Sequence, residues 1–290
     1  MQRNDTTNMK HNLIFILISL TLTVFGQIPN DLEKTAKLDN WIIPTSKTEK
    51  LRILEKLKGN EQFDWISYSF KNNDSSCIKM LHVVDFNCDG ISDLIYNGFV
   101  GAESNRVIFM KGNSDGTYSY VIGLWGRLIE ISDFDGFSPL SFTIYNYACC
   151  AGVINHIERY TPIWKESDFG YELQGKYSMY YSVDLPKVRF EKAIGFKTEN
   201  EKYFLRLNPF INDTILLDHD EEGNKFAEYP KDSEGIAIAE QTDETGRVWW
   251  FVMMKNNIKP NWSLYVNGDN NESKAYYLGW ISSRFVKRLE

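Results

Sequence analysis

Short runs in which apolar and polar residues alternate dominate the chain from residue 63 onward, and these runs are rich in Val, Ile, Tyr and Phe. Gly, Asn and Asp separate them, which is the pattern of β-strands joined by turns. The clearest runs are Ile78–Val84, Arg106–Met110, Tyr118–Leu124 and Ser141–Tyr147. The pattern predicts a mainly β protein.

A helical period appears near the start of the chain, within residues 27–60. Ser46-Lys-Thr-Glu49 fits a capping box, in which the Ser46 hydroxyl accepts a hydrogen bond from the Glu49 amide. An apolar stripe with three- and four-residue spacing follows, and Gly59-Asn60 can end the helix. The stripe consists of Leu51, Ile53, Leu54 and Leu57.

The apolar run Leu13–Phe25 follows Lys10 and His11 and precedes Gly26. It is short for a membrane span, which takes about 20 apolar residues. Its three-part arrangement is typical of a secretory signal peptide cut before Gln27. We therefore expect residues 1–26 to be removed and the protein to be exported, periplasmic or extracellular, without a transmembrane span. A retained membrane anchor is the alternative.

The composition is that of a globular protein: 290 residues, 43% hydrophobic and 14% aromatic, with a formal net charge of -7. The aromatic content excludes a disordered chain, and the acidic balance argues against a nucleic-acid partner. Asn208-Pro209-Phe210 is a plausible domain boundary. We expect a signal peptide (1–26), a helical segment (27–60), a first β module (61–207) and a second β module (208–290).

An acidic loop in the first module alternates oxygen-bearing side chains with other residues and contains Gly90, which permits a sharp turn. Its candidate calcium ligands are Asp85, Asn87, Asp89, the carbonyl of Ile91, and Asp93. Calcium prefers such sets of hard oxygens. The loop is not an EF-hand, because its twelfth position is Tyr96 instead of glutamate. The sequence predicts a structural calcium that braces the loop; an Asp/Asn turn without metal is the alternative.

The sequence around this loop, His82–Tyr96, resembles an FG-GAP or VCBS-type repeat, the calcium-binding unit of integrin-like β-propellers. Arg106–Tyr118 is similar to the strand and turn that follow the loop in such repeats, and Ile131–Gly136 looks like a shortened second copy. The resemblance covers residues 80–137. A closed propeller needs typically four or more blades, so we expect a small sheet, a sandwich or a partial propeller-like module.

The second module resembles a bacterial SH3-like (SH3b) domain over residues 213–289. Gly279–Val286 is similar to the closing Gly-Trp-Val-x-x-x-Tyr-Leu signature, and Thr245–Val252 is similar to the central Gly-x-Trp-x-x-Val strand. The resemblance implies a small barrel that binds cell-wall peptide or a protein partner. Lys255–Lys274 departs from it as a long polar insertion.

Aromatic residues of this module are the candidate ligand-binding residues: Trp249, Trp250, Trp262, Tyr276 and Tyr277. Trp249 and Trp250 are adjacent in a predicted strand, so their rings must point to opposite faces. One ring would fill the core and the other could form an aromatic wall. The alternative is that these rings only stabilise a small barrel.

The four cysteines are candidates for disulfides in an exported protein. Cys77 and Cys88 are poor partners for each other if a straight strand separates them, because Cα atoms more than about 7 Å apart cannot be bridged. Either could pair with Cys149 or Cys150, and these two could form a vicinal disulfide. Cys150 with His156 could instead form a nucleophile pair, although the residues around it do not match known cysteine peptidases.

Catalytic motifs are absent from the sequence: there is no His-Glu-x-x-His, no Gly-x-Ser-x-Gly and no phosphate-binding glycine loop. We assign no catalytic residue and expect an exported, non-enzymatic binding protein. Its partner would be cell-wall peptide or another envelope protein. Two alternatives remain: a cell-envelope hydrolase with an unrecognised site in residues 61–207, and an inhibitor or immunity-type interaction protein.

Overall fold

A computed structural model of the chain describes residues 36, 41–58, 60, 76–100, 105–131, 138–148, 152–165, 168–217, 221–256, 258–264 and 275–289. The described part is mainly β, as the sequence predicts. It divides into two compact units. The N-terminal unit comprises Asp31–Val183 and Trp262–Leu278; the described residues of the C-terminal unit fall within Asp184–Asn261 and Gly279–Glu290. The C-terminal unit thus begins before the boundary expected at residue 208.

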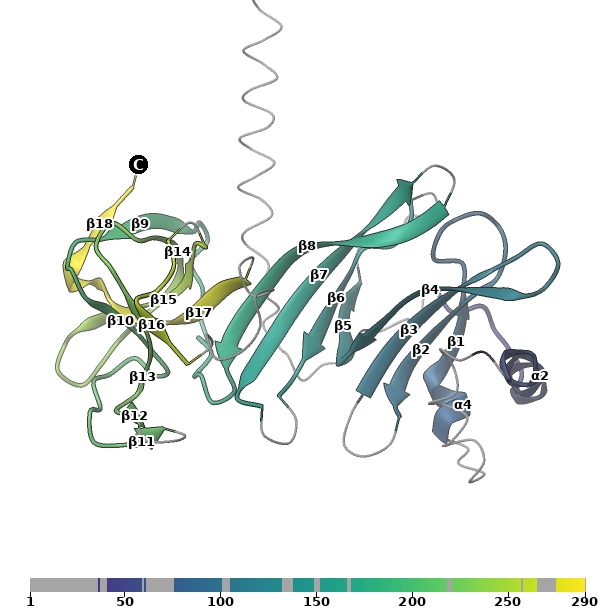
Figure 1. Ribbon diagram of the computed structural model, residues 1–290, viewed down its shortest axis with the longest axis horizontal. Coiled ribbons are helices and arrows are strands. Elements are labelled where there is room, and N and C mark those ends of the chain that lie inside the picture. The colour runs from purple at the N-terminus through teal and green to yellow at the C-terminus, as the bar shows by residue number, and fades with distance from the viewer. Residues whose placement is uncertain are drawn as a thin grey trace, which may run out of the picture. The chain divides into compact units, whose positions relative to one another are not determined.

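Within its described residues, the N-terminal unit contains two helices, one four-stranded antiparallel sheet and an antiparallel set of four strands that is part of a larger sheet (Figure 1); these are called the first and second sheet below. The helices are α2 (Lys47–Leu57) and α4 (Ser76–Met80). The first sheet has the order β1 (Leu81–Val84), β2 (Asp93–Phe99), β3 (Asn105–Gly112) and β4 (Tyr118–Trp125). The second has the order β5 (Arg127–Ile131), β6 (Phe142–Asn146), β7 (Ile154–Lys165) and β8 (Asp168–Tyr180).

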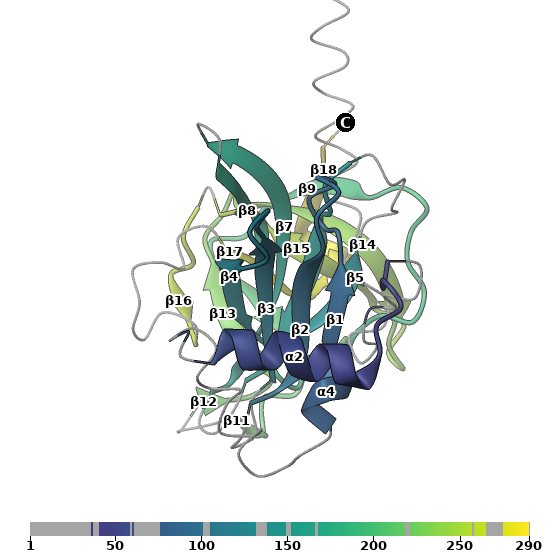
Figure 2. The same ribbon diagram turned by 90° about the vertical axis from the view of Figure 1, so that its right-hand side faces the viewer.

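Successive residues of a strand point to opposite sides, and the runs Leu94–Gly98 of β2 and Val107–Met110 of β3 are buried throughout, so these strands are covered on both faces. Val84 and Phe109 pack in one core cluster with Phe142 of the second sheet, and the Phe109 and Phe142 rings stack with their centroids 4.5 Å apart. Val83 packs in another cluster with Leu54 of α2. The second sheet therefore covers one face and α2 covers the other (Figure 2).

Helix α2 begins as the sequence predicts. The Ser46 Oγ accepts a hydrogen bond from the Glu49 amide at 3.1 Å. Ile53, Leu54 and Leu57 are buried against the first sheet, whereas Leu51 is 43% exposed. The apolar stripe is narrower than the four-residue pattern suggested.

The segment before β1 corrects one prediction. Ile78–Met80 belong to α4, although the apolar run from Ile78 predicted a strand there. Ile78 packs in the α2 cluster, and the Lys50 Nζ of α2 donates hydrogen bonds to the carbonyls of Ile78 and Leu81. These contacts with α2 favour a helical turn over an extended chain.

No helix in the described segments is long and apolar enough to cross a membrane.

The C-terminal unit is built from short strands (Figure 1). They are β9 (Ile194–Thr198), β10 (Tyr203–Arg206), β11 (Leu216–Leu217), β12 (Glu221–Glu222), β13 (Lys225–Tyr229), β14 (Glu234–Thr242), β15 (Val248–Met254) and β18 (Val286–Arg288). Strand β17 (Ala275–Ser282) pairs in parallel with β8 through its first residues, and its later residue Trp280 pairs with Arg206 of β10. Strand β16 (Trp262–Ser263) and the first residues of β17 fall within the residue range of the N-terminal unit.

Strand pairing in the C-terminal unit does not close into a ring within the described residues. The order runs β18-β9-β14-β15-β17, and β10 joins β17 to β13. No described pairing returns from β13 to β18. The described strands therefore do not form the closed small barrel that the sequence led us to expect.

Candidate functional site

The acidic loop lies between β1 and β2, and its side chains are organised by hydrogen bonds to its own backbone. Asp85 accepts from the amides of Asp89 and Gly90 at 3.2 and 3.0 Å. The Asn87 amide donates to Asp89 at 2.9 Å. Gly90 has a φ of +82°, a left-handed conformation that glycine adopts without strain. The three predicted ligand side chains thus converge on one turn.

Asp93 anchors this loop to the first sheet. Its carboxylate is fully buried and accepts hydrogen bonds from the amides of Phe86 at 3.0 Å and Gly112 at 2.7 Å. Burial first, and then the nearby charges of Asp89 and Asp85, raise the pKa of Asp93 to about 7, although the two backbone hydrogen bonds act to lower it. Three carboxylates therefore share one small region, and a bound cation would stabilise their ionised forms.

The donor chemistry of the loop suits calcium. Asp85, Asn87, Asp89 and the Ile91 carbonyl supply hard oxygens, and Asp93 holds the loop base. In the described part of the chain, no three His, Cys, Asp or Glu side chains form a metal-holding group. The candidate site therefore depends on the amide and carbonyl oxygens as well as on carboxylates.

The cysteines predicted to form disulfides are only partly described. Cys77 is buried in α4 and Cys88 is half-buried in the acidic loop, and no disulfide joins them. Cys149 and Cys150 lie outside the described residues. His156, which the sequence placed beside Cys150, has its Nδ1 2.8 Å from the Ser178 Oγ. Burial, and then the charge of Lys176, lower the pKa of His156 to about 4.

The aromatic residues proposed as ligand contacts are mostly buried. Trp249 and Trp250 are 1% and 3% exposed, since β15 lies between β14 and β17 and both of its faces are covered. Tyr277 is also buried. Trp262 and Tyr276 are half-buried, and the Tyr276 ring stacks on Tyr177 with centroids 5.7 Å apart.

Neither Trp249 nor Trp250 presents its ring to solvent, so the expected aromatic wall is absent from β15. The Trp249 indole donates to the Asp243 carboxylate at 2.8 Å, and Trp250 packs edge-on against Phe196. Trp280 is 1% exposed and contacts Phe251. These rings stabilise the C-terminal unit.

The C-terminal unit instead contains a cavity of about 570 Å³ beside the turn between β14 and β15. Its lining includes Phe210 and Ile211, which are 42% and 47% exposed. The charged lining residues are Asp184, Asp243, Glu244 and Arg247. The cavity thus combines an exposed apolar surface with charges of both signs.

Two of these charged residues are fixed by the turn. Asp243 accepts hydrogen bonds from the Thr245 hydroxyl and the Trp249 indole, which hold its pKa well below the ordinary value. Arg247 lies over the Trp249 ring, 5.7 Å from its centroid. Its buried Nε has no hydrogen-bond partner among the described residues. The turn therefore positions one carboxylate and one guanidinium at the cavity.

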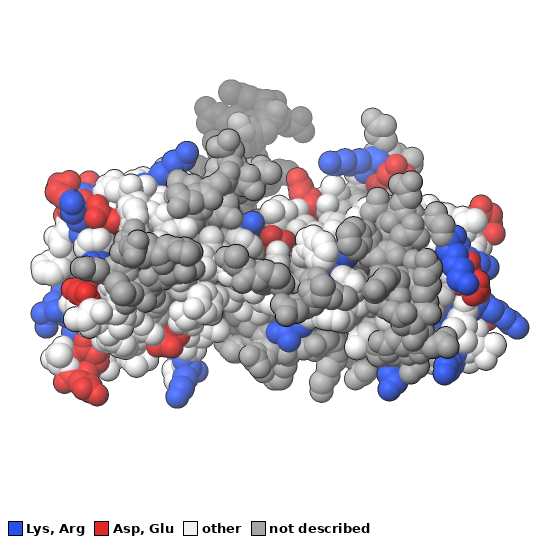
Figure 3. All heavy atoms as spheres, turned by 60° about the horizontal axis from the view of Figure 1, so that its bottom comes forward, with Lys and Arg blue, Asp and Glu red and all other residues white. Residues whose placement is uncertain are grey.

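Positive and negative side chains are mixed on the molecular face drawn in Figure 3. Charge alone therefore does not mark a binding site among the described residues of that face, and the cavities are the remaining candidates. Sequence reasoning did not name Phe210 and Ile211 as candidate binding residues, although the Asn208-Pro209-Phe210 segment was noted as a boundary. An apolar pair directly after a proline in a predicted loop was the available signal.

Comparison of the chain with protein-family models, with curated proteins and with solved structures found no match.

Proposed function

We propose that the protein is an exported, non-enzymatic binding protein whose C-terminal unit binds a peptide of the cell envelope. The cavity beside the β14–β15 turn carries this proposal, because exposed Phe210 and Ile211 lie with charges of both signs. An apolar peptide side chain would cover Phe210, which supplies affinity through burial. The SH3b resemblance of residues 213–289 supports the same class of ligand.

The charges of the cavity favour a zwitterionic partner. Arg247 would pair with a peptide carboxylate, which a guanidinium can bind through two hydrogen bonds. Asp184 and Glu244 are exposed and would attract an ammonium group. A peptide that carries both groups would satisfy the two charge signs at once, whereas a purely anionic ligand would be repelled by the carboxylates.

The N-terminal unit has a supporting role in this proposal. Its acidic loop would bind calcium through Asp85, Asn87, Asp89 and the Ile91 carbonyl, with Asp93 anchoring the loop. The FG-GAP resemblance of residues 80–137 supports this assignment. Calcium would brace the turn between β1 and β2 by offsetting the repulsion among its carboxylates.

The test is retention of the mature chain, from Gln27 onward, on purified peptidoglycan, followed by titration with peptides released from it. Phe210→Ala should weaken binding about tenfold, because a buried Phe side chain contributes roughly 1.5–3 kcal/mol. Phe285→Ala is the matched control, since Phe285 is a 50% exposed phenylalanine of the same unit outside the cavity lining.

Three results would contradict the proposal. The folded mature chain could fail to be retained, or Phe210→Ala could bind as well as Phe285→Ala. Release of soluble fragments from the peptidoglycan would indicate the hydrolase alternative instead. Copurification with one envelope protein, without retention on peptidoglycan, would indicate the inhibitor or immunity-type alternative.

A further inference from the structure

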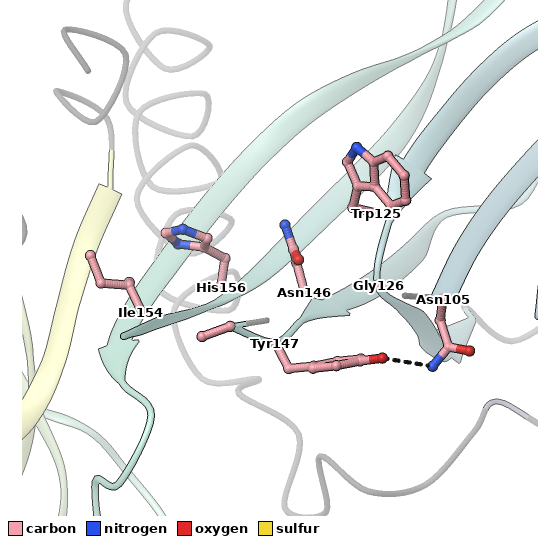
Figure 4. A pocket seen from close by; sticks show the side chains of 8 residues that line it. Asn105, Trp125, Gly126, Asn146, Tyr147, Ile154 and His156 are labelled. Carbon is pink, nitrogen blue, oxygen red and sulfur yellow. Dashed lines mark hydrogen bonds between the residues drawn. The ribbon is translucent and has the colours of Figure 1, made fainter. Parts of the chain in front are cut away.

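A second cavity, of about 290 Å³, lies within the N-terminal unit where four strands begin or end (Figure 4). Asn105 is the first residue of β3 and Trp125 is the last residue of β4. Asn146 is the last residue of β6, and His156 is near the start of β7. Tyr147 follows β6 and completes the polar and aromatic lining.

Gly126 creates this cavity by turning the chain directly from the first sheet into the second. Its φ is +111°, and a Cβ there would lie 2.4 Å from the Tyr145 carbonyl oxygen. Its amide donates to the Asn105 carbonyl at 2.9 Å. The turn brings the end of β4 close to the end of β6, so Trp125 and Tyr147 line one cavity.

The two aromatic rings of the cavity are held by neighbouring groups. Trp125 is 46% exposed, and the Arg106 guanidinium lies 5.2 Å from its ring centroid. The Tyr147 hydroxyl accepts a hydrogen bond from the Asn105 amide at 3.2 Å, drawn as a dashed line in Figure 4. The Arg127 guanidinium lies 5.9 Å from the Tyr147 ring centroid. Such support keeps the rings in place before a ligand arrives, which lowers the entropic cost of binding.

The polar groups of the cavity are uncharged. Asn146 lies directly opposite His156 in the β6–β7 pairing, and Figure 4 shows its amide between the His156 and Trp125 rings. The Asn146 side chain is partly buried and lines the cavity, and its amide can both donate to and accept from a ligand. His156 is neutral at pH 7, because burial lowers its pKa to about 4.

The described lining contains no Asp, Glu, Lys or Arg. The nearest guanidiniums, of Arg106 and Arg127, lie over the Trp125 and Tyr147 rings and are not part of the lining. A charged ligand would therefore lose water in this cavity without an ion partner in the lining itself, which favours a neutral ligand. The volume is at the lower end for small-molecule sites, which suits a single ring. An aromatic wall beside a side-chain amide fits a ring with an apolar C–H face and several hydroxyls.

We propose that this cavity binds a neutral pyranose residue of a glycan. The sugar C–H face would pack on Trp125, and its hydroxyls would hydrogen-bond to Asn146 and His156. The site is in a different unit from the proposed peptide cavity and does not depend on it. A protein with both sites would bind a glycan and a peptide separately.

The experiment is saturation-transfer NMR on the full mature chain with methyl glycosides of glucose, galactose and N-acetylglucosamine, and with adenosine as a flat aromatic probe. At least one glycoside should bind with a Kd of about 1 mM. Trp125→Ala should weaken that binding at least about tenfold, and Asn146→Ala about fivefold. Trp164→Ala should leave it unchanged, because Trp164 is a 55% exposed tryptophan of the same unit outside the described lining.

The proposal is overturned if no glycoside binds, if adenosine alone binds, or if Trp125→Ala retains the wild-type affinity. Asn146→Ala provides the deciding variant should Trp125→Ala fail to fold by circular dichroism. Phe210→Ala should not change glycoside binding. Failure of peptide binding and failure of glycoside binding are therefore separate results.

Discussion

Two hairpins, one in each unit, have turns of the same kind, but their tryptophans differ in solvent exposure. The β3–β4 turn has a hydrogen bond from the Gly116 amide to the Asn113 carbonyl, and the β14–β15 turn has one from Gly246 to Asp243. Both glycines have a φ of +78°. Trp125 at the end of β4 is 46% exposed, whereas Trp249 in β15 is 1% exposed.

The neighbours of each strand explain this difference. Strand β4 is at the edge of the described first sheet, while β15 is paired on both sides, with β14 and β17. Both faces of β15 are covered, since Trp249–Met254 are all buried, whereas β4 has exposed positions along its length. The same local hairpin therefore yields a candidate binding residue in one unit and a core residue in the other.

The largest expected difference is in stability. Trp249→Ala should destabilise the C-terminal unit by about 3–5 kcal/mol, because it leaves a large cavity in the core. Trp125→Ala should cost the N-terminal unit less than about 1 kcal/mol. Urea denaturation with hydrogen exchange resolved by unit measures both values. Equal losses of unfolding free energy would show that the exposure of the two tryptophans does not determine how much each contributes to stability.

Acid sensitivity should be concentrated in the N-terminal unit. Burial lowers the pKa values of His82 and His156 to about 4, with the charges of Lys50 and Lys176 as second causes. The unfolded chain takes up protons below pH 6.5 and the folded chain only near pH 4, so stability falls as the pH drops between these values. Protonation of His156 alone lowers the free energy of unfolding by up to about 3 kcal/mol over this pH range.

His156→Gln isolates this contribution, because Asp93 acts with the opposite sign. The pKa of Asp93 is raised to about 7, so its contribution to stability increases as the pH falls from 7 toward 4. The difference in unfolding free energy between wild type and His156→Gln should change between pH 7 and pH 4. A constant difference across that range would contradict the prediction.

Calcium should stabilise the N-terminal unit and leave the C-terminal unit unchanged. At about 100 times its Kd the ion adds about 2.7 kcal/mol to the stability of the unit that binds it. Asp89→Ala should abolish the rise in Tm, and Asp168→Ala, an exposed aspartate of the same unit, should preserve it. A calcium-dependent rise that persists in Asp89→Ala would place the ion elsewhere.

The smallest expected effect is the difference in stability loss between two glycine-to-alanine substitutions. Gly246→Ala should cost about 1–2 kcal/mol through its positive φ alone, because no atom lies within 4 Å of the added Cβ. Gly126→Ala should cost at least about 1 kcal/mol more, since its Cβ meets the Tyr145 backbone. The unfolding free energies measure this difference. Gly126→Ala with the smaller loss would show that the turn into the second sheet relaxes easily.

Local patterns in the sequence predicted local structure well. The capping box placed the start of α2 at Ser46, and the apolar runs near Arg106–Met110 and Tyr118–Leu124 became β3 and β4. The run from Ile78 failed, because its contact with Lys50 of α2 is 28 residues distant in the chain. The β-propensity of a short run carries no information about a contact with a residue so distant in the chain.

The candidate sites differ in whether local sequence patterns could identify them. The acidic loop is a contiguous stretch, Asp85–Asp93, so the sequence alone identified it. The cavity for which we propose a pyranose combines Asn105, Trp125 and Asn146 from three separate strands, and only the pairing of the strands brings them together.

The sequence by itself determined the β class, the helix cap and the acidic loop, because each depends on residues close together in the chain. The tertiary structure alone decided which tryptophans are exposed and where cavities form. Burial depends on which strands and helices cover a residue, and those neighbours are brought in from distant parts of the chain. Trp125 and Trp249 differ for that reason.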